Sequence, residues 1–314
     1  IDCFYFLKAE PMKTNAWTFL RTGLLVFLTA ISVIAQDVVV TKAGGERIGL
    51  DIGDLRVSSD AAAAVFAQTL RSDLQRSGWF NLVAPGRGEW RVSGSVEVRG
   101  DRLEARVQAQ MAGGGRAALS KAFQSSNAEA RRLAHVVADE IVQAITGRPG
   151  FAASRLAVIG RRGAAKELFI CDSDGANLRQ VTHDNTISLY PRWTPDGQRI
   201  VYTSYLKRFP DVLVVDLAEG RRVRLAAFPG LNAGGAVSPD GRLVALILSR
   251  DGNPELYVMR LADRSLVRLT HTPHAGESSP TWSPDGRQIA FVSDVSGRPQ
   301  IYVINRDGGA PQRV

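Results

Sequence analysis

The stretch PTWSPDGRQIAFVSD, residues 280–294, decides the fold because the chain repeats it. A near copy, PRWTPDGQRIVYTSY, occupies residues 191–205, and a more divergent copy, GAVSPDGRLVALILS, occupies residues 235–249. In the shared Pro-Asp-Gly, proline presets the first turn position, aspartate can bond its own backbone, and glycine tolerates a positive φ. Each copy therefore predicts two short strands joined by a tight reversal.

The copies recur at a nearly constant interval. Pro-Asp-Gly begins at Pro195, Pro239 and Pro284, at intervals of 44 and 45 residues. The motifs ELFI, DVLV, ELYV and QIYV keep this interval at residues 167, 211, 255 and 300, as does an apolar strand through residues 156, 200, 244 and 289. A period in the low forties is typical of four-stranded propeller blades. The repeats therefore predict an all-β propeller over residues 155–314.

The number of repeats predicts an incomplete ring. The strand at Leu156 matches the second strand of a blade and has no first strand before it, whereas three complete blades follow. About four blades are therefore expected here, and a six-bladed ring would need about 100 further residues at roughly 44 per blade. We expect a C-terminally truncated chain with open blade edges that favour association.

The region before the repeats predicts a small α/β domain at residues 36–147, followed by a linker at residues 148–154. A helix at about residues 58–78 is expected to have Ser58 or Ser59 as its cap and Val65, with other apolar residues, on its inner face. Residues 90–111 alternate as a hairpin with Met111 on the inner side, and a second helix covers about residues 127–146. We expect the two helices to pack together on one face of a small mixed sheet, because this arrangement buries the apolar faces of all these elements in one core.

The N-terminus resembles a secretion signal. Residues 1–11 are expected to be translated in error from upstream of the start at Met12. Residues 12–35 are expected to be a signal peptide, with Lys13 and Arg21 before an apolar run from Gly23 to Ile34, and with Val33 and Ala35 placed for cleavage before Gln36. This run is shorter than the roughly twenty residues of a membrane span. The alternative is a buried or membrane-anchoring helix. After cleavage Cys171 would be the remaining cysteine, so no internal disulfide is expected.

Composition narrows the classes of partner. A content of 45% hydrophobic and 22% charged residues is that of a folded protein. The net charge is +8, but the basic residues are spread thinly, in pairs such as Arg221-Arg222. Without a basic patch, this charge does not favour nucleic-acid binding.

The repeat motifs resemble those of the TolB family, the periplasmic propeller proteins of the Tol–Pal system. The resemblance rests on the W-S/T-P-D-G turns, on SDVSGRPQIYVINRDGGAPQRV at residues 293–314 and on LYVMRLADRSLVRLT at residues 256–270, and it spans about residues 37–314. It implies a non-enzymatic periplasmic scaffold without cofactor that serves outer-membrane integrity and cell division. The implied partners are the peptidoglycan-associated lipoprotein Pal, TolA and other envelope proteins.

The resemblance also implies where these partners bind. Pal is expected on the face built from the loops between blades and between second and third strands, which are longer than the Pro-Asp-Gly turns. Tyr190 and Glu277 are the first choices as anchors, and Leu231 stands where the family often has a polar or basic residue. The full candidate set is Asn185, Tyr190, Leu231, Asn232, His274, Glu277 and Ser278. The alternative is that these loops are only solvated.

The implied TolA-binding segment lies directly after the cleavage point. It comprises Gln36, Asp37, Val38, Val39, Val40 and Thr41. Its apolar centre suits capture by strand addition. The alternative is an edge strand of the first domain.

Other kinds of site have weaker signals. His271 and His274 have an H-x-x-H spacing on a proline-containing loop, and DSDG at residues 172–175 matches the turn between third and fourth strands; no metal site is expected from either. A propeller-bearing serine peptidase, which would need a hydrolase domain after the propeller, and a metal-dependent propeller enzyme remain as alternatives.

Overall fold

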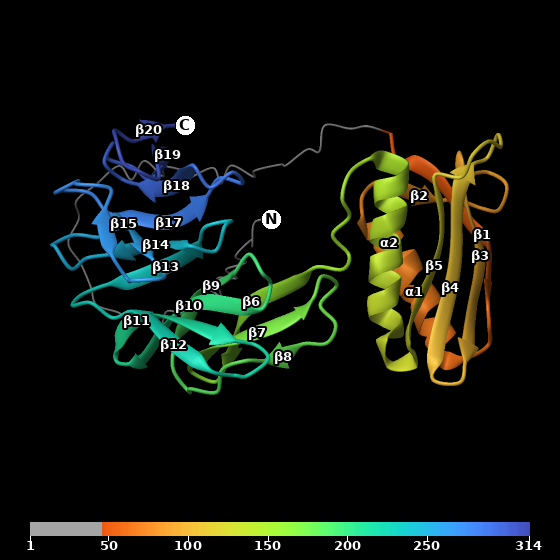
Figure 1. Cartoon of the computed structure of the whole chain (residues 1–314), viewed down its shortest axis with the longest axis horizontal. Helices are drawn as coiled ribbons and strands as arrows, with labels where there is room; N and C mark the ends of the chain where they lie inside the picture. Colours follow the sequence, from red (N-terminus) through yellow and green to blue (C-terminus); the bar gives the residue numbers. More distant parts are fainter. Residues whose placement is uncertain (1–45) are drawn as a thin grey trace, which may run out of the picture.

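The computed structural model describes residues 46–314. The predicted signal peptide and the segment from Gln36 to Thr41 lie outside the described residues. Two regions follow one another along the chain, a mixed sheet with two helices and a set of antiparallel sheets (Figure 1). This architecture confirms the predicted fold class.

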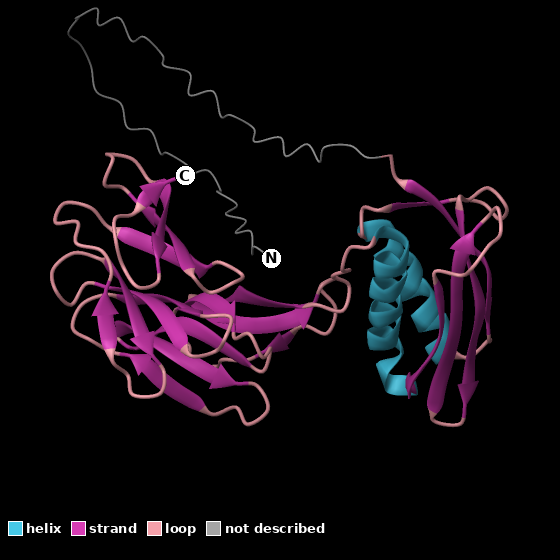
Figure 2. Cartoon of the chain, turned by 45° about the horizontal axis from the view of Figure 1, so that its top comes forward, coloured by secondary structure: helices cyan, strands magenta, loops and turns pink. Residues whose placement is uncertain are grey.

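The first region is a five-stranded sheet with the strand order β2-β1-β3-β4-β5. β1 pairs in parallel with β2 and β3, while β3, β4 and β5 pair antiparallel. Helices α1 and α2 lie together on one face of this sheet (Figure 2). The elements are β1 (Ile48–Val57), α1 (Ala61–Arg76), β2 (Phe80–Leu82), β3 (Trp90–Arg99), β4 (Arg102–Met111), β5 (Leu119–Ser126), the short 3-10 helix η1 (Asn127–Glu129) and α2 (Ala130–Thr146).

The apolar periodicity explains this packing, with three local corrections. Phe66, Leu70 and Leu74 of α1 are buried in one core with Val137 and Ile141 of α2, but Val65 is 43% exposed. Asp60 occupies the N-cap of α1 in place of Ser58 or Ser59 and makes no capping side-chain bond. Met111 is 56% exposed because it is the last residue of β4, at the hairpin end.

The second region consists of four blades in chain order. Blade 1 has three strands, in the order β6-β7-β8, and blades 2 to 4 have four strands each. The missing first strand of blade 1 agrees with the prediction at Leu156. The strands are β6 (Arg155–Arg162), β7 (Ala165–Asp172) and β8 (Arg179–Gln180); β9 (Ser188–Trp193), β10 (Arg199–Lys207), β11 (Phe209–Asp216) and β12 (Arg222–Ala226); β13 (Asn232–Val237), β14 (Leu243–Leu248), β15 (Glu255–Arg260) and β16 (Leu266–Arg268); and β17 (Glu277–Trp282), β18 (Gln288–Ser293), β19 (Gln300–Asn305) and β20 (Gln312–Arg313).

The Pro-Asp-Gly turns form as their chemistry predicts. In blade 4 the amide of Gly286 donates to the carbonyl of Ser283 at 2.9 Å, and the hydroxyl of Ser283 donates to Asp285 at 2.6 Å. The Ser283 bond is the main reason that the pKa of the Asp285 carboxyl lies below its ordinary value. Blades 2 and 3 repeat the backbone bond at 2.9 and 2.8 Å.

Separate apolar layers hold neighbouring blades together. One layer joins blades 1 and 2 around Leu168 and Ile200, a second joins blades 2 and 3 around Val212 and Leu246, and a third joins blades 3 and 4 around Leu256 and Ile289. Each blade therefore buries its faces only against neighbours, as in other repeat architectures.

Candidate functional site

A pocket of about 560 Å³ lies among the first strands of blades 2 to 4 and the β6–β7 hairpin. Four of the seven residues predicted to bind Pal line it: Tyr190, Leu231, Glu277 and Ser278. The other three, Asn185, Asn232 and His274, lie outside its lining. The structure thus brings together side chains that lie up to about ninety residues apart in the sequence, from strands β9 and β17 and from the loop before β13.

A backbone irregularity recurs in the strands that form this pocket. Tyr190, Gly234 and Ser279 occupy equivalent places in β9, β13 and β17, with φ of 55°, 69° and 53°. Each stands where the pairing register with the second strand shifts. Bulges of this kind re-aim side chains beside binding sites, and a left-handed φ at Tyr190 and Ser279 carries a cost that glycine avoids.

The exposed lining combines aromatic, aliphatic and cationic groups. Tyr190 is 45% exposed, Leu231 is partly exposed, and Ser278 is exposed. Arg161 and Lys166 contribute positive charge from the β6–β7 hairpin, and Arg192 contributes it from β9. Such a surface suits a protein partner with apolar and acidic side chains.

Glu277 lies deeper than its predicted loop position suggested. It is the first residue of β17, is 3% exposed, and accepts hydrogen bonds from the hydroxyls of Thr272 at 2.9 Å and Ser293 at 3.0 Å. Burial raises the pKa of the Glu277 carboxyl to about 7, and the nearby Glu255 carboxyl adds to this increase. Its carboxyl therefore fixes the loop before β17, and the residue also lines the pocket.

The remaining candidates also divide by exposure. Asn232 is 1% exposed and its amide bonds to Phe228 within the preceding loop, so it shapes that loop from inside. Asn185 is exposed with φ of 52°, and its amide N–H donates to Glu167 Oε1 at 2.7 Å. His274 is exposed on the loop before β17.

Buried acidic residues lie near the start of the third strand in blades 1 and 3. The sequence analysis identified these residues only as positions of the repeated motifs. Glu167 and Glu255 are 1% and 0% exposed, and each accepts the backbone N–H of a loop residue, Asn185 and Thr272 respectively, at 2.7 Å. Arg268 also donates to Glu255 at 2.7 Å. The recurrence of an acid in ELFI, DVLV and ELYV was the signal that could have identified these loop anchors.

A second polar cluster joins the α/β region to blade 1. Asp174, in the turn between β7 and β8, contacts Arg131 of α2 and lies 3.7 Å from Arg76 of α1. His135 Nδ1 lies 2.6 Å from Asp73 Oδ2, and His135 Nε2 lies 3.9 Å from Asp174 Oδ2. Burial lowers the His135 pKa, but the bond to Asp73 and the charges of Asp73 and Asp174 outweigh it, so the pKa is raised.

This cluster is built as an ion-pair network. Asp73, His135 and Asp174 place possible ligand atoms within 4.8 Å of one another. However, the guanidinium groups of Arg76 and Arg131 already approach these carboxylates, and two fixed cations disfavour a third at the same oxygens. The linker is anchored nearby, because Asp139 accepts the amides of Ala152 and Ala153 at 2.7 and 2.9 Å.

Within residues 46–314, none of the helices has the length and apolar character needed to cross a membrane.

Comparison with protein families gives one match over more than half of the chain. The family model described as the TolB beta propeller domain (PD40) matches residues 142–314. Among curated relatives, the "Tol-Pal system protein TolB" of Anaeromyxobacter dehalogenans is 37% identical and aligns over 71% of this chain and 56% of its own. The protein of the same name from Desulfosudis oleivorans is 31% identical over 64% of this chain and 45% of its own. The chain thus spans about half the length of these relatives.

A solved structure supports the same comparison. The crystal structure of TolB from Acinetobacter baumannii superposes with a TM-score of 0.77 at 27% sequence identity. The match covers 86% of this chain and 71% of that chain, so it includes the α/β region as well as the blades.

Proposed function

The chain belongs to the TolB β-propeller family, and on that premise we propose that it is a non-enzymatic scaffold of the Tol–Pal envelope system, located in the periplasm. The pocket lined by Tyr190, Leu231 and Ser278, termed the loop-side pocket, would bind the peptidoglycan-associated lipoprotein Pal. The observation that carries this proposal is the convergence of Tyr190, Leu231 and Ser278, from three successive blades, on one pocket.

The chemistry of the pocket supports binding of a protein. Aromatic side chains at the centre of an interface supply much of the binding energy, and surrounding polar groups set the orientation. Tyr190 is held in a left-handed backbone conformation at a bulge, which orients its ring before a partner arrives. The cationic groups of Arg161 and Lys166 would attract an acidic partner surface.

A second contact is proposed for the segment from Gln36 to Thr41. Its valines would add as a strand to TolA, since main-chain hydrogen bonds give affinity in strand addition. In the full-length protein, deletion of residues 36–41 should weaken TolA capture and leave Pal affinity unchanged. Equal TolA capture by the deleted and intact proteins would exclude this role.

The experiment for the Pal site uses the exposed pocket residues. In the full-length protein, Tyr190→Ala combined with Leu231→Ala should reduce Pal affinity at least tenfold, about 1.4 kcal/mol, in isothermal titration calorimetry. Glu277 is omitted because its replacement would disturb the loop before β17. The matched control is Glu219→Gln, an exposed change in the turn between β11 and β12. Unchanged affinity of the double variant, or an equal loss in the control, would contradict the assignment.

A further inference from the structure

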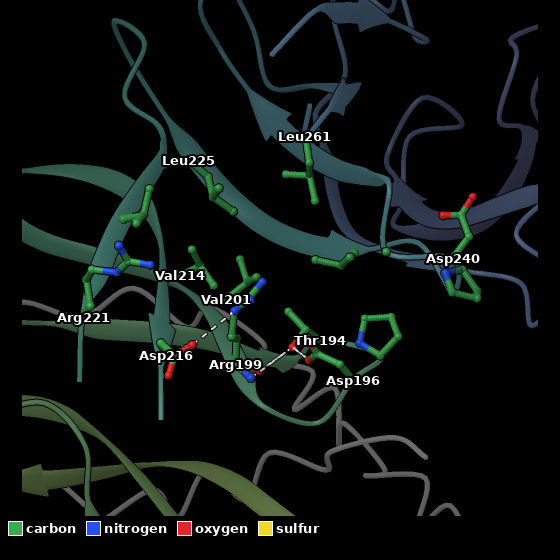
Figure 3. A pocket seen from close by; sticks show the side chains of 15 residues that line it. Thr194, Asp196, Arg199, Val201, Val214, Asp216, Arg221, Leu225, Asp240 and Leu261 are labelled. Carbon is green, nitrogen blue, oxygen red and sulfur yellow. Dashed lines mark hydrogen bonds and ion pairs between the residues drawn. The ribbon is translucent and has the colours of Figure 1, made fainter. Parts of the chain in front are cut away.

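A second pocket, of about 700 Å³, lies between blades 2 and 3 beside their Pro-Asp-Gly turns. Figure 3 shows Val201, Val214 and Leu225 of blade 2 facing Leu261 of blade 3 across it. Asp240 and Arg199 lie at its rim. Because the Pro-Asp-Gly turns and the loop-side pocket lie at opposite ends of the first strands, this groove is separate from the proposed Pal site.

The repeat sequence explains why the groove exists. The residue before Ser/Thr-Pro-Asp-Gly is Trp193 in blade 2 and Trp282 in blade 4, but Val237 in blade 3. Trp193 packs in the apolar layer between blades 1 and 2, and Trp282 packs in the layer between blades 3 and 4. Val237 occupies the same place between blades 2 and 3, where its isopropyl group leaves most of the space of an indole unfilled.

The two filled junctions show how this position holds an indole. The guanidinium of Arg155 lies 4.7 Å from the ring of Trp193 and donates to the carbonyl of Gly197 at 2.8 Å. At the other junction, Trp282 Nε1 donates to the carbonyl of Ala236 at 2.8 Å. Both junctions provide apolar walls, with a cation on the ring face at Trp193 and a carbonyl acceptor for the indole N–H at Trp282.

The groove between blades 2 and 3 retains the arginine and the apolar walls of this position but lacks the indole ring. Arg199 follows Arg155 by one repeat of 44 residues and lines the groove. Its side chain is 51% exposed and pairs with Asp216 at 3.4 Å (Figure 3). Val214 and Leu225 provide apolar walls. A half-exposed arginine beside an apolar slot is suited to an aromatic ring from another molecule.

We propose that this groove binds a tryptophan side chain presented by an extended segment of a partner protein. A buried aromatic side chain removes about 150–250 Å² from water, which makes it an effective anchor. The groove is larger than one indole, so it also has room for the residues that flank the tryptophan. Asp196, Asp240 and Arg221 at the rim can pair with polar groups of such a segment.

The test measures binding of a blocked peptide, acetyl-Gly-Gly-Trp-Gly-Gly-amide, to the isotope-labelled full-length protein by NMR. Amide shifts are expected around Val237, Leu225 and Arg199, and the leucine peptide of the same design should bind at least fivefold more weakly. Val237→Trp restores the indole of the repeat and should abolish the shifts, with melting temperature equal to or above that of the unchanged protein. Arg199→Ala should weaken binding severalfold.

Arg287→Ala is the matched control, because Arg287 is 82% exposed in the equivalent turn of blade 4 and should leave binding unchanged. If Val237→Trp does not fold, the shift map and the Arg199→Ala result still decide the matter. Shifts at the loop-side pocket alone, or equal binding of the leucine peptide, would each overturn the proposal. Loss of Pal binding in Tyr190→Ala would leave it untouched, so the two proposals fail separately.

Discussion

The junctions between blades and the junction between the α/β region and blade 1 are built differently. Blades meet through apolar layers, such as that of Val201 and Leu246. The α/β region meets blade 1 through charges, with Asp174 beside Arg131 and His135. Apolar contacts depend on area and shape, whereas ionic contacts depend on pH and salt. The blade junctions should therefore set the stability of the propeller, and the ionic junction should set how firmly the two regions dock.

The largest expected effect concerns the apolar junctions. Leu246 is fully buried between blades 2 and 3, so Leu246→Ala should lower the free energy of unfolding by about 2–5 kcal/mol through lost burial and a cavity. Denaturant unfolding of the full-length protein measures this. Val267→Ala, at a side chain that is 58% exposed, should change it by less than about 0.5 kcal/mol. Similar decreases in the free energy of unfolding of both variants would show that the apolar layer between blades 2 and 3 does not dominate the stability of the propeller.

The second-largest expected effect is a pH dependence of stability, because the junction between blades 3 and 4 contains a buried acid, Glu277. The pKa of Glu277 is raised from 4.5 to about 7, so folding favours its protonated form. The contribution of protonated Glu277 to the free energy of unfolding is complete below pH 4.5, and it is lost as the pH rises through about 7. Glu277→Gln should remove about 2 kcal/mol of pH dependence between pH 5 and pH 8. Chemical denaturation at both pH values measures it, and Glu219→Gln, an exposed change, should keep the original dependence.

The third prediction tests the ionic junction. Asp174→Asn removes the charge that faces Arg131 and Arg76, whose side chains are 35% and 48% exposed. After allowance for solvent screening, docking should weaken by about 1–2 kcal/mol while each region stays folded. Limited proteolysis at residues 148–154 should accelerate, and melting of the propeller should not change. Glu97→Gln, in an exposed pair with Arg99, is the control. Equal cleavage rates would show that the charges do not hold the junction.

The smallest effect concerns pH at the same junction. The acidic groups that act on His135 are Asp73 of α1, Asp172 at the end of β7 and Asp174 of the β7–β8 turn. Arg76 of α1 and Arg131 of α2 pair with Asp73 and Asp174. Its pKa is raised above 6.5, so its contribution to docking is full below pH 6.5 and is lost as pH rises through the folded value.

Cleavage at residues 148–154 should therefore be faster at pH 9 than at pH 6. His135→Asn should reduce this dependence, and the exposed change His274→Asn should retain it. A dependence that survives in His135→Asn would assign it to another group.

Local sequence chemistry was sufficient for the repeating elements. Proline, aspartate and glycine at Pro195 and its counterparts define turns through their own backbone preferences, and the 44–45-residue interval repeats them. The helices followed from apolar periodicity, with errors in the N-cap of α1 and in the face that Val65 occupies. These features depend on neighbours in the chain, so they can be predicted from it.

The candidate sites were less accessible from the sequence. Tyr190, Leu231 and Ser278 were named from their place before each first strand, and the structure puts them on one pocket. The burial of Glu277 could not be predicted, because it depends on Thr272 and Ser293 closing around it. The left-handed backbone at Tyr190 and Ser279 likewise has no local signal, since neither residue is glycine.

The sequence by itself determined the blades, their order and the two-helix region that precedes them, because turn chemistry and periodicity act over a few residues. Only the tertiary structure decided that Asp174 meets Arg131 and His135, and that Val237 faces an unfilled groove beneath Arg199. Those outcomes depend on side chains from distant repeats or from different regions meeting in space. The charges and volumes of these side chains can be matched to their surroundings only after the whole chain has packed.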